Sequence, residues 1–233
     1  MPHRINRRSC FFSWALMLSL TLIAGCATPA GTSAPASAPV TADDHHDEAA
    51  HAAATLPEVA AVDLAEGEKL RVVATTNIVG DVVRQIGGDA IDLTLLLPPG
   101  TDPHSYQARP DDLRTLNQAH VIFVNGLHLE EAMASVLENL DSDAPVIVIN
   151  TGVTTLELDA DHADDQHHEG ADPHTWMDVR NVEHWVENVA ATLSALDPAD
   201  AETFAANAAA YTTELAALHQ EIATALAAIP AAQ

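Results

Sequence analysis

The chain has 233 residues with 34 acidic and 9 basic side chains, which gives a formal net charge of −25 with histidine neutral. This charge excludes most modes of nucleic-acid binding, because neutralising backbone phosphates requires a basic surface. Aromatic residues make up only 4% of the chain, which disfavours a stacking platform for bases. The hydrophobic content of 48% suffices for a folded core, and the length fits one domain, or one domain and part of another.

Residues 1–26 have the pattern of an export signal. Three arginines are followed by an apolar segment, 11–24, which is shorter than the ~20 residues needed to span a bilayer. The segment ends in Leu-Ile-Ala-Gly-Cys, which resembles the lipobox of bacterial lipoproteins, where the cysteine, here Cys26, is lipidated. The alternative is an ordinary signal peptide with a chance cysteine. A chain lipidated at Cys26 is expected outside the cytoplasm, anchored to the cell membrane.

Residues 27–67 are rich in Ala, Thr, Pro, Ser, Asp and His and show no apolar periodicity. Such a segment buries too little apolar surface to offset its chain entropy, so we predict a disordered acidic tether. Its histidines, His45, His46 and His51, lie among acidic residues. A cluster of this kind either collects metal weakly or is a solvated spacer, and the sequence favours neither.

Residues 68–196 alternate short apolar runs with segments of helical periodicity. Strands are expected at 70–75, 91–97, 121–124 and 146–149, and helices at 78–86, 110–118, 129–140 and 179–196. The alternation predicts an α/β fold with a parallel sheet flanked by helices. Residues 197–233 follow as an Ala-rich helix that starts at the Asp197-Pro198 pair. A helix this long exceeds the needs of one small domain, so we expect it to lead into another part of the architecture.

One seven-residue pattern occurs twice. Residues 100–106 have the sequence Gly-Thr-Asp-Pro-His-Ser-Tyr, and residues 170–176 have Gly-Ala-Asp-Pro-His-Thr-Trp. Proline restricts the backbone beside each histidine, the aspartate can cap the turn or hold an imidazole tautomer, and the aromatic ring can shield one side. Neutral imidazole suits Zn²⁺, whereas Mn²⁺ favours added carboxylates. The repeat predicts His104 and His174 as metal ligands; the alternative is that each histidine only satisfies its own turn.

With these motifs, residues 69–233 resemble the zinc/manganese solute-binding lipoproteins of ABC transporters, metal-binding receptors also called adhesin lipoproteins. The resemblance rests on both histidine motifs, on Met177-Asp178 after the second, and on residues 73–77 and 121–127. It implies two α/β lobes bridged by one long helix, with the metal between the lobes. His104 and His174 then match the first two ligands. The other two, a His or Glu and an Asp, come from a second lobe without counterpart here, so we expect an N-terminal lobe and a truncated interlobe helix, 197–233.

Zinc-selective members of that family often carry a loop rich in histidine and acidic residues before the second ligand motif. Residues 159–170 match such a loop, and we expect His162, His167 and His168 to act as a secondary metal-capture site. The alternative is a solvated insertion. The resemblance therefore favours zinc, with manganese as the second choice.

The resemblance implies a binding protein and not an enzyme. We expect it to capture a divalent metal outside the cytoplasm and to deliver it to the permease of an ABC transporter. A zinc hydrolase would need a general base beside an open metal position, and the sequence has no His-Glu-x-x-His segment. The alternative function is a cell-surface adhesion protein whose metal site is only structural.

Overall fold

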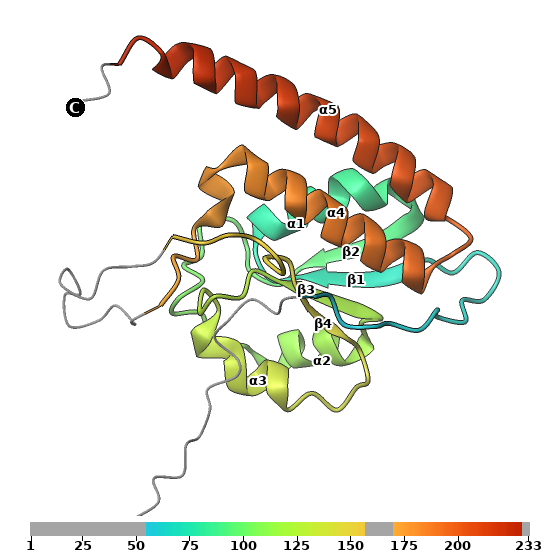
Figure 1. The fold of residues 1–233 in the computed structure, drawn as a ribbon. Coiled ribbons are helices and arrows are strands. Elements are labelled where there is room, and N and C mark those ends of the chain that lie inside the picture. Colours follow the sequence, from blue (N-terminus) through green and yellow to red (C-terminus); the bar gives the residue numbers. More distant parts are fainter. Residues whose placement is uncertain (1–54, 157–169, 230–233) are drawn as a thin grey trace, which may run out of the picture. The chain divides into compact units, whose positions relative to one another are not determined.

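The computed structural model of the chain describes residues 55–156 and 170–229. Four strands in these ranges form one sheet, in which all neighbours are parallel and the order is β2-β1-β3-β4 (Figure 1). The strands are β1 (Leu70–Ala74), β2 (Ile91–Leu95), β3 (Val121–Val124) and β4 (Val146–Val148). The predicted parallel α/β sheet is therefore confirmed.

Successive residues of a strand face opposite sides of the sheet, and in this protein both sides are buried. In the central strand β1, Val72 belongs to one hydrophobic cluster and Val73 to the other. Strand β3 repeats this alternation with Phe123 and Ile122, and both side chains are fully buried. Burial on both faces explains the continuous apolar run of β3, whereas the edge strand β2 exposes Asp92 and Thr94 on one face.

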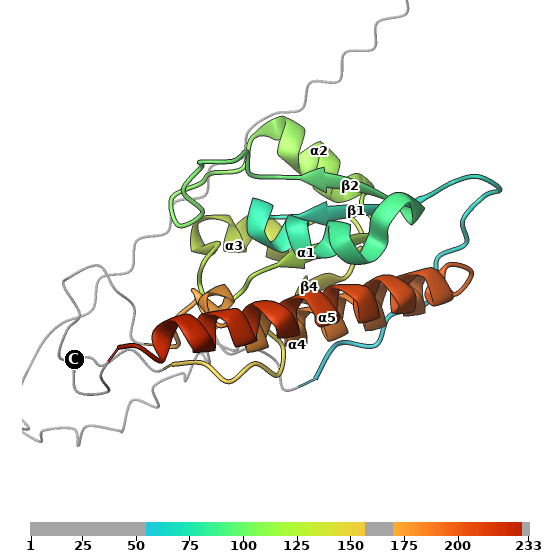
Figure 2. The ribbon, with the colours of Figure 1, turned by 90° about the horizontal axis from the view of Figure 1, so that it is seen from above.

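Helices cover the two faces of the sheet unequally (Figures 1 and 2). One face carries α1 (Asn77–Gly87) and α4 (Val179–Leu196), and α5 (Ala201–Leu226) packs against both of these helices. The opposite face carries α2 (Pro110–Gln118) and α3 (Ala134–Glu138). Short 3₁₀ helices follow at 88–90, 131–133 and 175–177. The larger of the two core clusters lies on the face covered by α1, α4 and α5.

Helix α3 is shorter than the predicted helix 129–140. The chain first passes through three consecutive residues with positive φ, at 76° for Gly126, 53° for Leu127 and 62° for His128. A left-handed backbone cannot continue into a right-handed helix without a break. A 3₁₀ turn therefore precedes the five residues of α3.

Residues 55–67, which the sequence places in the predicted tether 27–67, pack against the folded domain. Leu56, Val59, Val62 and Leu64 pack against the core cluster that contains α1 and α4. The Val62 N–H also donates to the Leu196 carbonyl at 2.8 Å. These apolar residues lie in an irregular segment without helical or strand periodicity, which explains why the sequence pattern did not reveal them. The expectations for residues 1–54, including Cys26, lie outside the described residues.

Helix α5 begins at Ala201, four residues after the expected Asp197. The Asp197 N–H donates to the Leu193 carbonyl and thereby closes α4, and its carboxylate accepts the Ala199 N–H at 3.1 Å. Phe204 and Leu215 are buried, whereas the apolar side chains at 218, 222 and 226 are 40–55% exposed. In the described ranges, none of the helices has both the length and the apolar character needed to cross a membrane.

Candidate metal centre

A pocket of about 320 Å³ lies at the carboxyl edge of the sheet, and the chain that follows each of the four strands contributes to its wall. Its lining residues are Thr76, Asn77 and Ile78 after β1; Leu97, Gly100, Thr101, Pro103 and His104 after β2; Leu129 after β3; and His174 and Trp176 after β4. In the sheet, β2 lies beside β1 and β4 lies beside β3, so the connections from the two central strands lead to opposite edges. Open α/β sheets bind ligands beyond the carboxyl ends of their strands, at such a switch of direction.

The structure brings the two histidines of the repeated motif together. The ring centres of His104 and His174 are 5.7 Å apart, with the ring planes inclined at 52°. Their loops follow β2 and β4, which are the two edge strands, so opposite edges of the sheet supply the two imidazoles. Both residues are exposed, and the His174 side chain keeps 46% of its surface accessible.

The repeated sequence folds into a repeated turn. The Asp102 carboxylate accepts the His104 backbone N–H at 3.0 Å, and the Asp172 carboxylate accepts the His174 N–H at 2.9 Å. The two aspartates differ in their second bond. Asp102 accepts the Ser105 hydroxyl at 2.7 Å, whereas Asp172 Oδ1 lies 2.7 Å from Nδ1 of the His174 ring. Only the second aspartate therefore contacts its own imidazole through a hydrogen bond.

Both carboxylates are held in the ionised form. The Ser105 hydroxyl, and then the His104 N–H, lower the pKa of Asp102 below its ordinary value. Burial acts to raise the pKa of Asp172, but the hydrogen bonds from the His174 backbone and ring outweigh it and the pKa is lowered. An ionised acceptor at Nδ1 favours the His174 tautomer with its proton on Nδ1, which leaves the Nε2 lone pair available to a metal.

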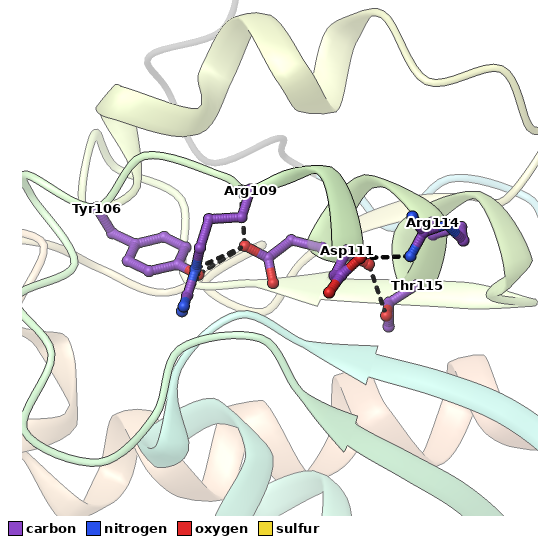
Figure 3. A network of polar contacts seen from close by, with 6 residues as sticks. Tyr106, Arg109, Asp111, Arg114 and Thr115 are labelled. Carbon is purple, nitrogen blue, oxygen red and sulfur yellow. Dashed lines mark hydrogen bonds and ion pairs between the residues drawn. The ribbon is translucent and has the colours of Figure 1, made fainter.

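The two aromatic residues of the motif have different roles. The Trp176 ring meets the His174 ring edge-on, with centres 5.2 Å apart, and lines the pocket as predicted. The Tyr106 hydroxyl instead donates to the Asp112 carboxylate at 2.7 Å, and the Arg109 guanidinium donates to the phenol oxygen (Figure 3). Burial, followed by the bond to Asp112, raises the pKa of Tyr106. Tyr106 therefore ties its loop to the start of α2.

Sequence reasoning missed a buried polar network below the second histidine. Asn125 follows β3 and Asn150 follows β4, and neither side chain is exposed. The buried Glu130 carboxylate accepts the Thr75 hydroxyl at 2.6 Å and the Asn125 N–H at 2.8 Å. Burial raises the pKa of Glu130, and these hydrogen bonds oppose that effect. The available signal is an asparagine directly after each of the apolar runs 121–124 and 146–149.

The described residues do not supply a complete metal site. Within 55–156 and 170–229, no three side chains of His, Cys, Asp or Glu lie close enough together to hold a metal ion. His162, His167 and His168 lie outside the described residues, and their capture role stays a prediction. The flanks of their segment meet beside the second histidine, because the Asp172 N–H donates to the Leu156 carbonyl at 2.8 Å.

Comparisons with known proteins show relatives in sequence and in fold. The family profile of zinc-uptake complex component A, periplasmic (ZnuA), matches residues 72–233. The manganese-binding lipoprotein MntA of Halalkalibacterium halodurans is 36% identical over 168 residues, covering 72% of this chain and 53% of that protein. Among solved structures, the periplasmic zinc-binding protein TroA of Treponema pallidum has a TM-score of 0.63 at 30% identity, covering 70% of this chain and 57% of that one. The Mn-bound periplasmic metal-binding protein of Candidatus Liberibacter asiaticus has a TM-score of 0.57 at 32% identity, with coverages of 63% and 53%.

The chain spans about half the length of the curated relatives it matches. These relatives are named as binding or uptake components, in agreement with the expectation that the protein is not an enzyme. The resemblance drawn from the histidine motifs is confirmed by the family match and by the shared fold. The chain belongs to the ZnuA family of metal-uptake components, the metal-binding receptors of ABC transporters.

Proposed function

We propose that this chain captures a divalent metal ion outside the cytoplasm for uptake by an ABC transporter, with His104 and His174 as ligands. The observation that carries the proposal is the 5.7 Å separation of the two ring centres, which loops from opposite sheet edges produce. The metal is the substrate of the protein. The family supports this role, since its relatives are named for the binding or transport of zinc, manganese or iron.

The spacing of the rings suits one shared ion. A Zn–N bond is about 2.0–2.1 Å long and a ligating nitrogen lies roughly 1.1 Å from its ring centre, so two imidazoles on one tetrahedral ion have centres roughly 5 Å apart. A wider angle at the metal brings this value to about 6 Å. The observed 5.7 Å falls between these values, so the separation of the ring centres is compatible with one shared ion.

The exposure of the site supports capture over a purely structural role. Structural zinc sites are closed by four protein ligands, whereas both imidazoles here are exposed, and no third His, Cys, Asp or Glu joins them within residues 55–156 and 170–229. We infer that water or residues outside the described ranges complete the coordination shell. The predicted contribution of a second lobe stays a prediction.

We further propose zinc as the preferred metal. Two neutral imidazoles suit Zn²⁺, whereas Mn²⁺ gains more from carboxylate and water oxygens. The histidine-rich sequence of residues 157–169 favours the same choice, because soft imidazole donors suit Zn²⁺ better than Mn²⁺. The relatives named for manganese make competition between the two metals the decisive comparison.

Delivery and anchoring belong to the same proposal. Lipidation at Cys26 would hold the protein at the membrane, close to the permease that receives the metal. The net charge of −25 would raise the local concentration of cations around the tethered protein. Replacing Cys26 with alanine should release the protein from the membrane fraction without changing its zinc affinity.

Zinc titration of the metal-stripped chain, in competition with a chromophoric chelator, tests the site. His104→Ala and His174→Ala should each weaken the tightest site at least ten-fold, and manganese should displace zinc only in large excess. His120→Asn is the matched control, because His120 Nδ1 accepts the Arg71 N–H outside the pocket and asparagine retains an acceptor there. Parental affinity in both alanine variants would show that the ligand assignment is wrong.

A further inference from the structure

The turn that carries His174 is bonded on both sides of the histidine to asparagines that follow the sheet strands. The Asn125 side-chain amide donates to the Pro173 carbonyl at 3.1 Å, one residue before His174. The Thr175 hydroxyl, one residue after it, donates to the Asn150 side-chain oxygen at 2.6 Å. The turn is thus held on both sides of His174 by residues at the ends of β3 and β4, through a part-buried bond at Pro173 and a buried one at Thr175.

The two asparagines are themselves fixed. The Asn150 amide donates to the Asn125 carbonyl at 2.9 Å, and the Asn150 oxygen also accepts the Trp185 indole N–H at 2.8 Å. The Asn125 backbone N–H is bound by the Glu130 carboxylate. Both asparagine side chains are fully buried, where a lost hydrogen bond leaves a polar group without solvent to replace it.

The first histidine turn is held differently. The Asp102 carboxylate binds the backbone and the hydroxyl of the two residues that follow the proline, and the Thr101 N–H donates to the Pro98 carbonyl. Tyr106 adds its bond to Asp112, six residues further along the chain. These bonds join near neighbours in sequence, whereas Asn125 and Pro173 are 48 residues apart. The sheet therefore fixes the second turn more directly than the first.

We propose that Asn125 and Asn150 are positioning residues for metal capture, which act by holding the His174 turn through Pro173 and Thr175. The inference rests on the proposed function, because it assigns these residues to the same site. Residues that orient a metal ligand from behind typically change metal affinity 10- to 100-fold when they are replaced. His174 then serves as the fixed ligand against which the ion and the His104 ring are arranged.

Thr175→Val tests the attachment in the full chain. Valine has the same shape without the hydroxyl, and the Asn150 oxygen keeps its bond from Trp185, so the fold should survive. We expect zinc affinity to fall about ten-fold, within the range for such residues. In metal-free protein, the amides of Met177 and Asp178, which close the following 3₁₀ turn, should exchange faster with deuterium. Thr175→Ser retains the hydroxyl and should keep both the zinc affinity and the amide exchange rates of the parent protein.

Thr151→Val is the matched control. Thr151 is also buried, and its hydroxyl donates at 2.7 Å to the carbonyl of Val148 in β4, which is not part of the His174 turn. This variant should keep zinc affinity within about three-fold, since removing the bond costs stability without moving the ligand. Equal losses of affinity in the two valine variants, or parental affinity in Thr175→Val, would overturn the proposal.

Asn125→Ala tests the bond from Asn125 to the Pro173 carbonyl. Like Thr175→Val, it should weaken zinc binding and speed the exchange of the Met177 and Asp178 amides. His174→Ala separates this inference from the proposed function. If that variant binds zinc as tightly as the parent, the proposed ligand is wrong, and amide exchange alone then decides whether the asparagines hold the turn. Faster exchange only in Thr175→Val and Asn125→Ala supports the attachment, and unchanged exchange refutes it.

Discussion

The two copies of the histidine motif allow the roles of the Asp102 and Asp172 carboxylates to be compared. Asp172→Asn should weaken zinc binding more than Asp102→Asn. Asparagine retains an oxygen that can accept the backbone N–H of each turn, so both turns should persist. The difference is that Asp172 also lies 2.7 Å from Nδ1 of its histidine, whereas the second bond of Asp102 comes from Ser105.

The expected loss of zinc affinity can be worked out from the change of a charged hydrogen-bond acceptor, the Asp172 carboxylate, into a neutral amide. A hydrogen bond to a charged group contributes about 1.5–3 kcal/mol, and a neutral one about 0.5–1.5 kcal/mol, so losing the charge costs about 1.5 kcal/mol in a dry site. The His174 and Asp172 side chains are 46% and 32% exposed, and solvent reduces the difference to about 1 kcal/mol. That corresponds to about five-fold in affinity. The loss of a nearby negative charge is common to both variants and cancels in the comparison.

The assay is zinc competition with a chelator, together with nitrogen NMR of the imidazoles in the metal-free chain. The Asp172→Asn variant should bind zinc about five-fold more weakly than Asp102→Asn, and its His174 ring should lose its preference for the Nδ1 proton. Equal affinities in the two variants, with an unchanged tautomer, would refute the role assigned to the ring hydrogen bond.

Three further measurements examine the stability and the surroundings of the site. Thr75→Val should lower the free energy of unfolding by about 2 kcal/mol at pH 7.5, because a buried carboxylate loses a donor. Burial raises the pKa of Glu130 and the Thr75 hydroxyl acts to lower it, so the hydroxyl binds the ionised form more strongly than the neutral acid. The cost of Thr75→Val in urea unfolding should therefore decrease as the pH falls through the raised pKa of Glu130. Phe204→Ala should cost about 3–5 kcal/mol in the same assay, whereas Ile222→Ser, at a 40% exposed position of the same helix, should stay within about 0.5 kcal/mol. Replacing residues 157–169 with a Gly/Ser segment of equal length should reduce the number of weak zinc sites and retain the tightest one, and loss of the tightest site in equilibrium dialysis would contradict the capture role.

Much of the fold could be predicted because its signals are local. The apolar runs that became β1 to β4 carry their burial in their composition, and Pro110 marks the start of α2 within one turn. The repeated Asp-Pro-His sequence forms the same turn at both places, because an aspartate that accepts the N–H two residues later needs no distant partner.

Tertiary structure decided how these pieces meet. The order β2-β1-β3-β4 puts the two histidine loops on opposite edges and lets their rings converge, and no spacing in the chain encodes that order. It also placed Asn125 beneath Pro173 and turned Tyr106 toward Asp112 instead of the pocket. Periodicity and turn chemistry act over a few neighbouring residues, whereas a hydrogen bond across 48 residues exists only after the strands have been ordered and packed.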